Sequence, residues 1–250
     1  MTRLFDVTDK VVCVTGASSG LGKQAASLLA NAGARVVGLA RRTEALAAWS
    51  DQTPGETAHL TADLSDRNAL HDIARDAAKP FGGIDILINA AGINTRQKAE
   101  DVSDAGWDMT LNLNLAAPFF LSQAMAPGMK AKRWGRIVNF ASLQSRRAFP
   151  GGISYGASKG AVEQMTRAMA EAWSSDGITA NALAPGFFRT ELTGPVFNDP
   201  VLAQRNADQT CIGRNGEPAD LDGPLMFFCS DASAYVTGQT LFVDGGFTAK

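Results

Sequence analysis

Seven short apolar segments alternate with stretches of helical periodicity, and this alternation sets the strongest limit on how the chain can fold. Several segments, such as 84–88, are apolar almost throughout, which is typical of parallel strands covered by helices on both faces. The pattern predicts a doubly wound, Rossmann-type α/β fold with a parallel sheet of about seven strands and right-handed crossovers. The expected strands are 11–15, 35–40, 59–62, 84–89, 136–141, 179–183 and 240–243, and the expected helices are about 20–32, 65–79, 107–132, 154–176 and 218–229.

A single domain spanning residues 1–250 is expected, because no linker rich in Pro, Gly and Ser and no block of charge divides the chain. A chain of this length buries roughly three-quarters of its unfolded surface, which is enough for a sizeable core. The stretch 184–218 is irregular and rich in Pro, Gly and Phe. A loop this long inside a compact domain is usually a lid or binding loop, so we predict a substrate lid at about 186–217.

Composition excludes several classes of protein. The net charge of -2 favours neither nucleic acid nor an anionic membrane as a partner. Three widely separated cysteines are expected to be reduced, and two histidines make a metal site improbable, so no metal is expected. No apolar run approaches the roughly 20 residues that span a bilayer, and no apolar signal segment precedes the first strand. We therefore expect a cytoplasmic location.

A glycine-rich loop follows the first strand and opens the first helix. Gly16 permits a tight turn, while Gly20 and Gly22 allow the backbone and the helix to approach a pyrophosphate. The helix N-terminus presents free N–H groups to such an anion. A glycine-rich turn without a ligand is the alternative, but the position within a βαβ unit favours dinucleotide binding. The predicted contacts from this loop are Gly16, Ser18, Ser19, Gly20, Leu21 and Gly22.

The end of the second strand bears on which dinucleotide is bound. An acidic residue there would hold the adenosine ribose of NAD, but the chain instead carries Arg41 and Arg42. Two guanidinium groups can clamp a 2′-phosphate, so the sequence favours NADP as cofactor over NAD. The alternative is that both arginines only flank a solvated helix start. A basic residue in place of Ser19 would have strengthened the NADP interpretation.

The next two strand ends should also border the cofactor, because ligands bind at the carboxyl ends of strands in such sheets. Asp63 could accept the adenine amino group, or could simply begin the following helix. The predicted contacts from these two ends are Asp63, Leu64, Asn89, Ala90 and Gly92.

Tyr155 and Lys159 are four residues apart on a predicted helix, so their side chains lie on one face. A nearby positive charge lowers the pKa of a phenol, which normally lies near 10. Ser142, at the end of a strand, could donate to a carbonyl oxygen beside the phenol. These three residues are a candidate proton-transfer site, although Tyr and Lys also meet at this spacing by chance.

The chain resembles the short-chain dehydrogenase/reductase family across essentially its full length. The resemblance is carried by TGxxxGxG at 15–22, an NNAG-like segment at 89–92 with Ala90 in place of Asn, Asn114, Ser142, the Tyr155 and Lys159 pair, Pro185-Gly186 with Thr190, and Val243-Asp-Gly-Gly246. Within the family, the nearest likeness is to gluconate 5-dehydrogenases and related sugar-acid dehydrogenases, through segments 92–96, 141–145, 190–193 and 213–217. Thr95 and the segment 146–149 depart from those enzymes.

The resemblance implies hydride transfer between a nicotinamide and a carbonyl or alcohol carbon. Tyr155 would exchange the proton, Lys159 would lower the Tyr155 pKa and bind the nicotinamide ribose, Ser142 would hold the substrate oxygen, and Asn114 would anchor a water. Thr190 would hold the carboxamide. The other implied contacts beside the nicotinamide are Pro185, Gly186 and Phe188. The family usually forms tetramers, so a homotetramer is expected.

The resemblance implies a small-molecule carbonyl or alcohol compound as the substrate. Arg96 and Arg147 could each bind a carboxylate, which favours a sugar acid or related hydroxy acid, whereas the phenylalanines favour an apolar ketone. The expected substrate wall comprises Gln144, Phe149, Ile153, Phe187, Phe188, Glu191, Arg96 and Arg147. A 3-oxoacyl thioester reductase and a catalytically silent dinucleotide-binding regulator are the remaining alternatives.

Overall fold

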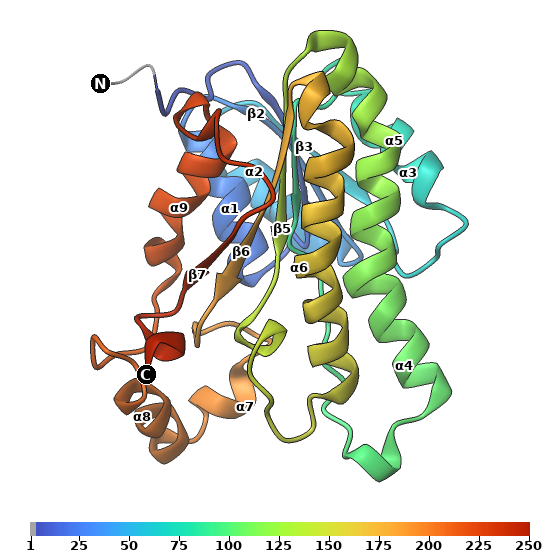
Figure 1. The fold of residues 1–250 in the computed structure, drawn as a ribbon. Helices are drawn as coiled ribbons and strands as arrows, with labels where there is room; N and C mark the ends of the chain where they lie inside the picture. Colours follow the sequence, from blue (N-terminus) through green and yellow to red (C-terminus); the bar gives the residue numbers. More distant parts are fainter. Residues whose placement is uncertain (1–3) are drawn as a thin grey trace.

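Seven parallel strands form one sheet, in the order β3-β2-β1-β4-β5-β6-β7, within residues 4–250 that the computed structural model describes (Figure 1). The chain moves outward from β1 to β3, returns to pair β4 with β1, and then moves outward on the other side. This order confirms the predicted doubly wound sheet and places its switch point between β1 and β4. The strands are β1 Val11–Thr15, β2 Arg35–Ala40, β3 Thr57–Thr61, β4 Ile86–Asn89, β5 Gly135–Phe140, β6 Ile178–Pro185 and β7 Thr240–Val243.

Helices cover both faces of this sheet (Figure 1). Helices α1, α2 and α9 pack on one face and α3, α5 and α6 on the other. None of the helices within the described residues is long and apolar enough to cross a membrane. The helices are α1 Gly20–Asn31, α2 Thr43–Gln52, α3 Leu70–Ala78, α4 Asp104–Leu111, α5 Ala117–Lys132, α6 Ile153–Trp173, α7 Gly194–Phe197, α8 Pro200–Asp208 and α9 Asp222–Cys229.

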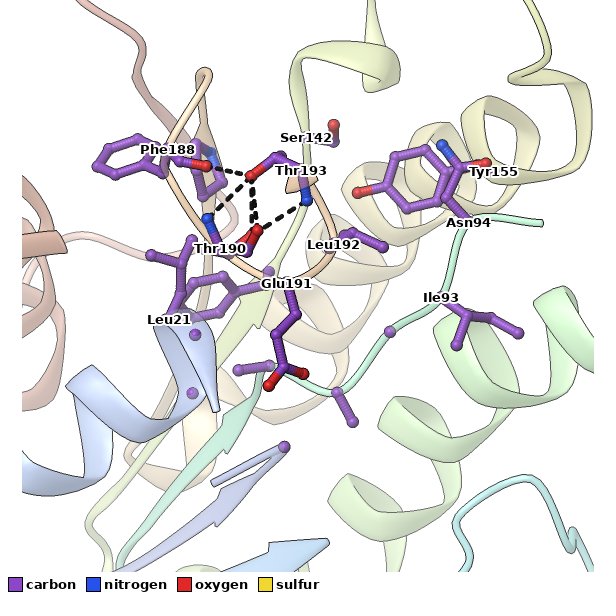
Figure 2. A pocket seen from close by; sticks show the side chains of 18 of the residues that line it. Leu21, Ile93, Asn94, Ser142, Tyr155, Phe188, Thr190, Glu191, Leu192 and Thr193 are labelled. Atoms are coloured by element: carbon purple, nitrogen blue, oxygen red, sulfur yellow. Dashed lines mark hydrogen bonds between the residues drawn. The ribbon is translucent and has the colours of Figure 1, made fainter. Parts of the chain in front are cut away.

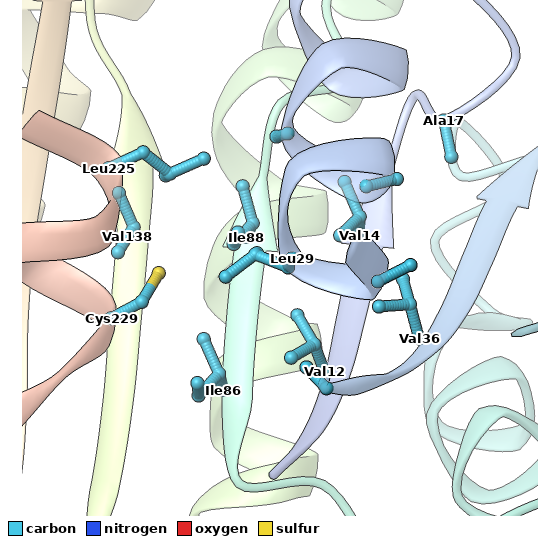
Figure 3. Packing of buried hydrophobic residues seen from close by; sticks show 14 of the residues in the cluster. Val12, Val14, Ala17, Leu29, Val36, Ile86, Ile88, Val138, Leu225 and Cys229 are labelled. Carbon is cyan, nitrogen blue, oxygen red and sulfur yellow. The ribbon is translucent and has the colours of Figure 1, made fainter. Parts of the chain in front are cut away.

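Two apolar cores result because successive strand residues point to opposite faces of the sheet. Val12 and Val14 of β1 pack with Leu29 of α1 and Leu225 of α9 (Figure 3). The intervening Cys13 packs in the other core with the residues of α3 and α5. All five residues of β1 are buried, as the uninterrupted apolar pattern of a central parallel strand requires.

The helix α2 was not predicted. Its only buried side chains are those of Leu46 and Trp49, and the rest of its surface is polar or partly exposed, so its apolar periodicity is weak. Contacts with α1 stabilise this helix instead. Trp49 is part of the buried core, and its Nε1 donates to Ser27 Oγ of α1 at 3.0 Å. The expected helix 65–79 also begins later, at Leu70, because local turns hold the chain before it.

The helix expected at 107–132 is divided into three parts. Helix α4 leads into a π-helical segment, Asn112–Ala116, which continues directly into α5. A π-helical turn contains one extra residue and is frequent at functional sites. Here it contains Asn114, whose side chain is almost fully buried at 1% exposure.

The segment predicted as a lid has secondary structure of its own. It contains the short helices α7 and α8, and its two ends are joined where Gly216 N donates to Phe187 O at 2.8 Å. A β-bridge between Phe188 and Gly216 continues this contact. The lid is therefore a folded segment whose two ends are hydrogen-bonded to each other.

Candidate active site

The carboxyl ends of the central strands border one cleft of about 820 Å³. The glycine-rich loop after β1 lines one end, the ends of β5 and β6 and the first turn of α6 line the other, and the lid covers the side. Most of the predicted site residues meet in this cleft. The members of the predicted set that line it are Gly16, Ser18, Ser19, Gly20, Leu21, Gly22, Arg41, Arg42, Leu64, Ala90, Gly92, Arg96, Ser142, Gln144, Phe149, Tyr155, Lys159, Pro185, Gly186, Phe187, Phe188, Thr190 and Glu191.

The glycine-rich loop has the shape that a pyrophosphate requires. Gly16 and Gly20 adopt φ angles of 75° and 55°, which side chains rarely tolerate. A Cβ on Gly22 would lie 2.8 Å from the carbonyl carbon of Gly16, so only glycine lets α1 approach the turn. Ser19 makes no side-chain cap at the start of α1, which leaves the first-turn N–H groups to an anion. These residues therefore fit a dinucleotide.

The loop after β4 is supported from β1. Thr15 Oγ1 accepts from the backbone N–H groups of both Ala90 and Ala91, each at 3.0 Å. Gly16 packs beneath the same loop, because a Cβ there would lie 3.1 Å from Ala91 Cα. Asn89 is buried below the cleft and does not line it, since its Nδ2 donates to Asn139 Oδ1 on β5 at 2.9 Å.

An ion pair crosses the open end of the cleft. Arg42 Nη1 lies 3.0 Å from Glu191 Oε1, and Arg42 Nη2 donates to Ser18 Oγ at 3.2 Å. Ser19 Oγ donates to the other carboxylate oxygen of Glu191 at 3.0 Å. The hydrogen bond from Arg42 is the main cause that lowers the pKa of Glu191. The lid is thus tied to the glycine-rich loop through the arginine that the sequence assigned to a 2′-phosphate.

Asp63 lies beside the cleft and not in its lining. Its Oδ1 accepts from both the backbone N–H and the hydroxyl of Ser65, at 3.0 and 2.7 Å. These bonds, more than the charge of Arg41, lower the pKa of the Asp63 carboxyl. The carboxyl therefore stabilises a turn, and Asp63 does not itself begin the following helix, which starts at Leu70.

Tyr155 and Lys159 occupy the first two turns of α6, as their spacing predicts. Both side chains are buried, at 8% and 5% exposure, and Lys159 Nζ lies 5.7 Å from the centre of the Tyr155 ring. Lys159 Nζ donates to the carbonyl of Phe140 at the end of β5, at 2.6 Å. Helix α6 and strand β5 are thereby joined at the proton-transfer site.

The pKa of Tyr155 is raised, not lowered, which corrects the expectation drawn from its neighbour Lys159. Burial is the main cause, and it is opposed by a hydrogen bond from Ser142 and by the charge of Arg96. Burial also lowers the pKa of Lys159 from 10.5 to about 8. At neutral pH the arrangement therefore contains a neutral phenol, which can donate a proton, beside a lysine that is still mainly cationic.

Ser142 is held in position by its own turn and by α6. Its Oγ accepts from the backbone N–H of Gln144 at 3.1 Å, and its hydroxyl hydrogen is directed at the Tyr155 phenol. Ser145 Oγ then donates to the carbonyl of Lys159 at 2.8 Å. The turn that carries Ser142 is thus bonded directly to the helix that carries Tyr155.

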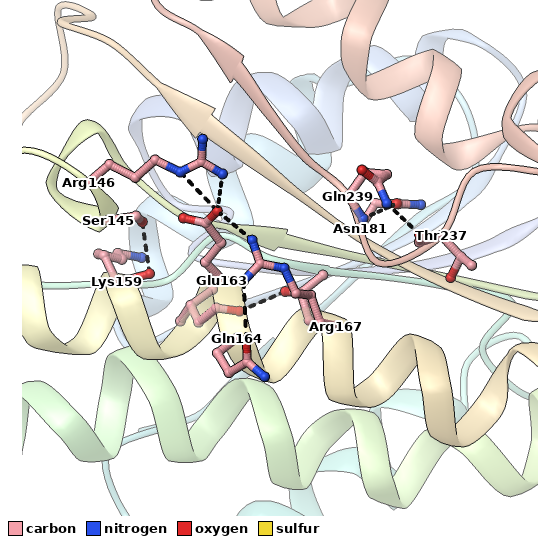
Figure 4. A network of polar contacts seen from close by, with 11 residues as sticks. Ser145, Arg146, Lys159, Glu163, Gln164, Arg167, Asn181, Thr237 and Gln239 are labelled. Carbon is pink, nitrogen blue, oxygen red and sulfur yellow. Dashed lines mark hydrogen bonds and ion pairs between the residues drawn. The ribbon is translucent and has the colours of Figure 1, made fainter. Parts of the chain in front are cut away.

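A buried carboxylate reinforces this connection. Glu163 Oε1, on α6, accepts from Arg146 Nε at 3.1 Å and from Arg167 Nη2 at 3.2 Å (Figure 4). Glu163 is only 5% exposed, and the two arginines that neutralise it come from the Ser142 turn and from α6 itself. This network was not predicted, because in the sequence Arg146 stands out only as part of a segment that departs from sugar-acid dehydrogenases.

Asn114 lies behind the cleft, not in its lining. Its Oδ1 accepts from Ile93 N and its Nδ2 donates to Ile93 O, both at 2.9 Å, while Nδ2 also reaches Ser158 Oγ at 3.1 Å. A Cβ on Gly92 would lie 3.2 Å from Asn114 Oδ1 and 3.7 Å from Lys159 Nζ. The side chain therefore clamps the loop after β4 directly against the lysine.

The substrate end of the cleft has one cationic wall and one aromatic wall. Arg96, held by a bond from its Nη2 to Leu192 O at 2.8 Å, lies on the first. Phe149 and Phe187 lie on the second, with ring centres 5.8 Å apart, and both pack against Phe247 of the carboxyl-terminal segment.

Two residues predicted for this end lie elsewhere. Ile153 is 51% exposed and does not line the cleft, because the first turn of α6 directs it outward. Arg147 also lies outside the lining, and its guanidinium stacks over the Phe247 ring at 5.7 Å. Of the two arginines considered for a substrate carboxylate, only Arg96 reaches the cleft.

A local hydrogen-bond network of threonine hydroxyl groups stabilises the first part of the lid (Figure 2). Thr193 Oγ1 donates to the carbonyl of Phe188 and lies 3.0 Å from Thr190 Oγ1. Thr190, the predicted carboxamide contact, thereby faces the cleft. Further lining residues, which were not predicted, approach from the lid, from the loop after β4 and from the π-helical segment, and the apolar residues of the unpredicted lid helices were the available signal. They include Ala91, Ile93, Asn94, Leu113, Val196, Leu202 and Asn206.

Comparison with known proteins gives a consistent result. Residues 16–248 match the family model described as "Enoyl-(Acyl carrier protein) reductase". The chain is 40% identical to the gluconate 5-dehydrogenase of Gluconobacter oxydans (strain 621H), over 99% of this chain and 98% of that one. It is also 40% identical to the 2-dehydro-3-deoxy-D-gluconate 5-dehydrogenase of Escherichia coli (strain K12), over 98% of each chain.

A solved structure agrees in fold. The gluconate 5-dehydrogenase of Burkholderia cenocepacia J2315, in complex with NADP and tartrate, superposes with a TM-score of 0.93 at 34% identity, covering 99% of this chain and 98% of that one. The matches span the glycine-rich loop, the Ser142 turn and the whole of α6. The chain therefore belongs to the short-chain dehydrogenase/reductase family and is an oxidoreductase that acts on CH–OH groups with a nicotinamide dinucleotide.

Proposed function

We propose that this protein is an NADP-linked dehydrogenase of a sugar acid or a closely related hydroxy acid. The observation that carries the proposal is the position of Arg96. Its guanidinium lines the substrate end of the cleft and is close enough to Tyr155 to lower the pKa of the phenol. A guanidinium binds a carboxylate through two parallel hydrogen bonds, which suits an acidic substrate. The names of the relatives, which refer to gluconate and its derivatives, support the same substrate class.

The chemistry follows from the protonation state of the buried pair. Tyr155 donates its proton to the carbonyl oxygen during reduction and takes it back during alcohol oxidation. When substrate is bound, Ser142 donates its hydroxyl hydrogen to the same oxygen, where negative charge develops. The cation of Lys159, held by Phe140 O, favours the phenolate that forms when the proton leaves.

The cofactor supplies the hydride, and the protein positions it. The glycine-rich loop would hold the pyrophosphate, Arg41 and Arg42 the 2′-phosphate, and Lys159 the nicotinamide ribose. Thr190, with the Pro185-Gly186 segment, would hold the carboxamide. Asn114 keeps the loop after β4 against Lys159, and a water bound beside it would connect the lysine to solvent.

The preference for NADP over NAD is supported by charge. Both arginines follow β2 and line the open end of the cleft, where no carboxylate stands at the end of β2 itself. A 2′-phosphate would gain charge-assisted hydrogen bonds from them, and a 2′-hydroxyl would gain less.

A substrate panel tests the proposal. Nicotinamide absorbance is followed with gluconate-like acids, the uncharged polyols of equal length, aryl ketones and 3-oxoacyl thioesters, in the direction each requires. We expect the acids to give the highest kcat/KM. The variant Arg96→Gln should raise KM for the acids by 10-fold to 100-fold and leave the polyols unchanged. Preference for an aryl ketone or a thioester would instead assign the activity to the aromatic wall of Phe149 and Phe187.

We also propose that the protein works as a cytoplasmic homotetramer. Strand β7 is an edge strand with Leu241 40% exposed, and Trp107 and Met109 on α4 are similarly exposed. Such apolar side chains on separate faces are consistent with more than one subunit contact. Light scattering should give four times the chain mass of 26.3 kDa, and a single-chain mass at micromolar concentration would contradict the tetramer.

A further inference from the structure

The carboxylate of Glu191 occupies the groups that would recognise a 2′-phosphate. Its Oε1 pairs with Arg42 Nη1, and its Oε2 accepts from Ser19 Oγ, each at 3.0 Å. Glu191 comes from the lid, 149 residues after Arg42 in the chain, so the contact is a product of the fold and not of local sequence. Figure 2 shows its side chain extending from the lid towards the strand ends.

A carboxylate in this place has an electrostatic consequence. It occupies one of the guanidinium nitrogens of Arg42 and puts a negative charge where a dianionic phosphate would bind. Both side chains are half-exposed or more, at 50% for Arg42 and 65% for Glu191, so solvent weakens the pair and a dianionic ligand can displace the carboxylate. A ligand without a 2′-phosphate does not need to break it.

We propose that Glu191 is a cofactor-selectivity residue, an internal competitor that the 2′-phosphate of NADP displaces from Arg42 and that NAD leaves in place. The proposal rests on the proposed use of NADP and adds a residue from the lid to the determinants at the end of β2. Because Glu191 belongs to the lid, the tie between the lid and the glycine-rich loop persists with NAD and is released with NADP. Discrimination between the two cofactors is consequently weaker than the two arginines alone would give.

Titration calorimetry with NADP and NAD in the absence of substrate tests the proposal on wild type and Glu191→Gln. The glutamine keeps the shape and an acceptor for Ser19 but removes the charge. We expect the Kd for NADP to fall about tenfold, equivalent to about 1.4 kcal/mol. The Kd for NAD should stay within twofold. Glu171→Gln, an exposed change on α6 outside the cleft, removes the same charge and should alter neither value.

The same substitution in an Arg42→Gln background distinguishes competition for the guanidinium from simple repulsion between Glu191 and the phosphate. In Arg42→Gln, NADP should bind more weakly, and the further change Glu191→Gln should improve its Kd by less than threefold, because no guanidinium remains to be contested. A full tenfold gain in that background would overturn the competition. Equal gains for both cofactors, no change, or weaker NADP binding in Glu191→Gln alone would also overturn it.

The result can be told apart from failure of the proposed function. The titrations contain no substrate, so they do not depend on whether a sugar acid is turned over. If wild type binds NAD more tightly than NADP, the proposed NADP preference fails. A tenfold gain for NADP alone in Glu191→Gln would still support the role of the carboxylate.

Discussion

The two ends of the cleft are built on different physical principles. At the end that contains Ser142, Tyr155 and Lys159 are buried and are held by hydrogen bonds to backbone and to neutral groups. At the open end, Arg41, Arg42 and Glu191 are exposed, and an ion pair holds Arg42 and Glu191 together. Burial makes each group at the first end costly to move, whereas solvent makes each ion pair at the second end weak and exchangeable.

This difference between the two ends matches two different tasks, proton transfer at the buried end and discrimination between cofactors at the exposed end. A proton donor needs a fixed position and must keep its proton until the transfer, and burial of the Tyr155 phenol provides both. A group that distinguishes two cofactors needs only a difference in affinity, which adjustable surface charges can supply. Substitutions at the buried end should therefore have large effects on rate and stability, and single substitutions at the exposed end should have small effects on affinity.

The largest effect is expected from Tyr155→Phe. Removal of the phenolic hydroxyl eliminates the proton transfer, so kcat should fall by about 10²-fold to 10⁴-fold, while the Kd for the cofactor stays within about twofold. Steady-state assays and a cofactor titration on the same preparation measure both. Near-normal turnover would show that the proton comes from another group and would break the contrast between the two ends.

An intermediate effect is expected from Lys159→Met, measured as a dependence of stability on pH. The folded pKa of about 8 lies below the ordinary 10.5, so between these values the unfolded chain binds the extra proton more readily. Wild type should thus gain stability relative to the variant as pH rises, by about 2 kcal/mol from pH 7.5 to 9.5. Urea unfolding at several pH values tests this, and a difference that does not change with pH would mean that the ammonium is not desolvated.

The smallest effect is expected from Arg41→Gln at the exposed end. Arg41 lines the cleft but is exposed, and its charge also acts on Asp63. Its loss should weaken NADP by only about twofold to fivefold, and the effect should vanish in high salt. An increase of more than a hundredfold in the Kd for NADP would show that Arg41 is the main phosphate contact. A single substitution at the open end would then have as large an effect as one at the buried end.

Sequence reasoning was strongest for features in which each residue has one physical use. The almost uniformly apolar segment 84–88 predicted a parallel strand covered on both faces, and the Tyr155 and Lys159 spacing predicted one helix face. It was weaker where a residue can serve two purposes. Asp63 could bind adenine or begin the following helix, and the structure places it in a turn before the start of α3 at Leu70.

What could not be predicted depends on contacts between distant parts of the chain. The pairing of Arg42 with Glu191 requires the lid to fold back over β2, and nothing near either residue indicates this. The Glu163 network similarly joins the Ser142 turn to α6, which only the folded backbone brings together. The raised pKa of Tyr155 could not be predicted either. The sequence shows the neighbouring lysine, whose charge would lower this pKa, but it does not show how far the phenol is removed from water.

The π-helical segment Asn112–Ala116 sets the angular phase between α4 and α5. An α-helix advances about 100° per residue, so one residue more or less within this segment turns everything on one side of it by that amount. Deletion of Leu115 would leave a continuous, regular helix and much of the packing of α5. The same deletion would rotate α4 and Asn114 relative to the sheet, away from Ile93 and the lysine behind it. The irregular turn therefore fixes the orientation of Asn114 behind the cleft relative to the face of α5 that packs in the core.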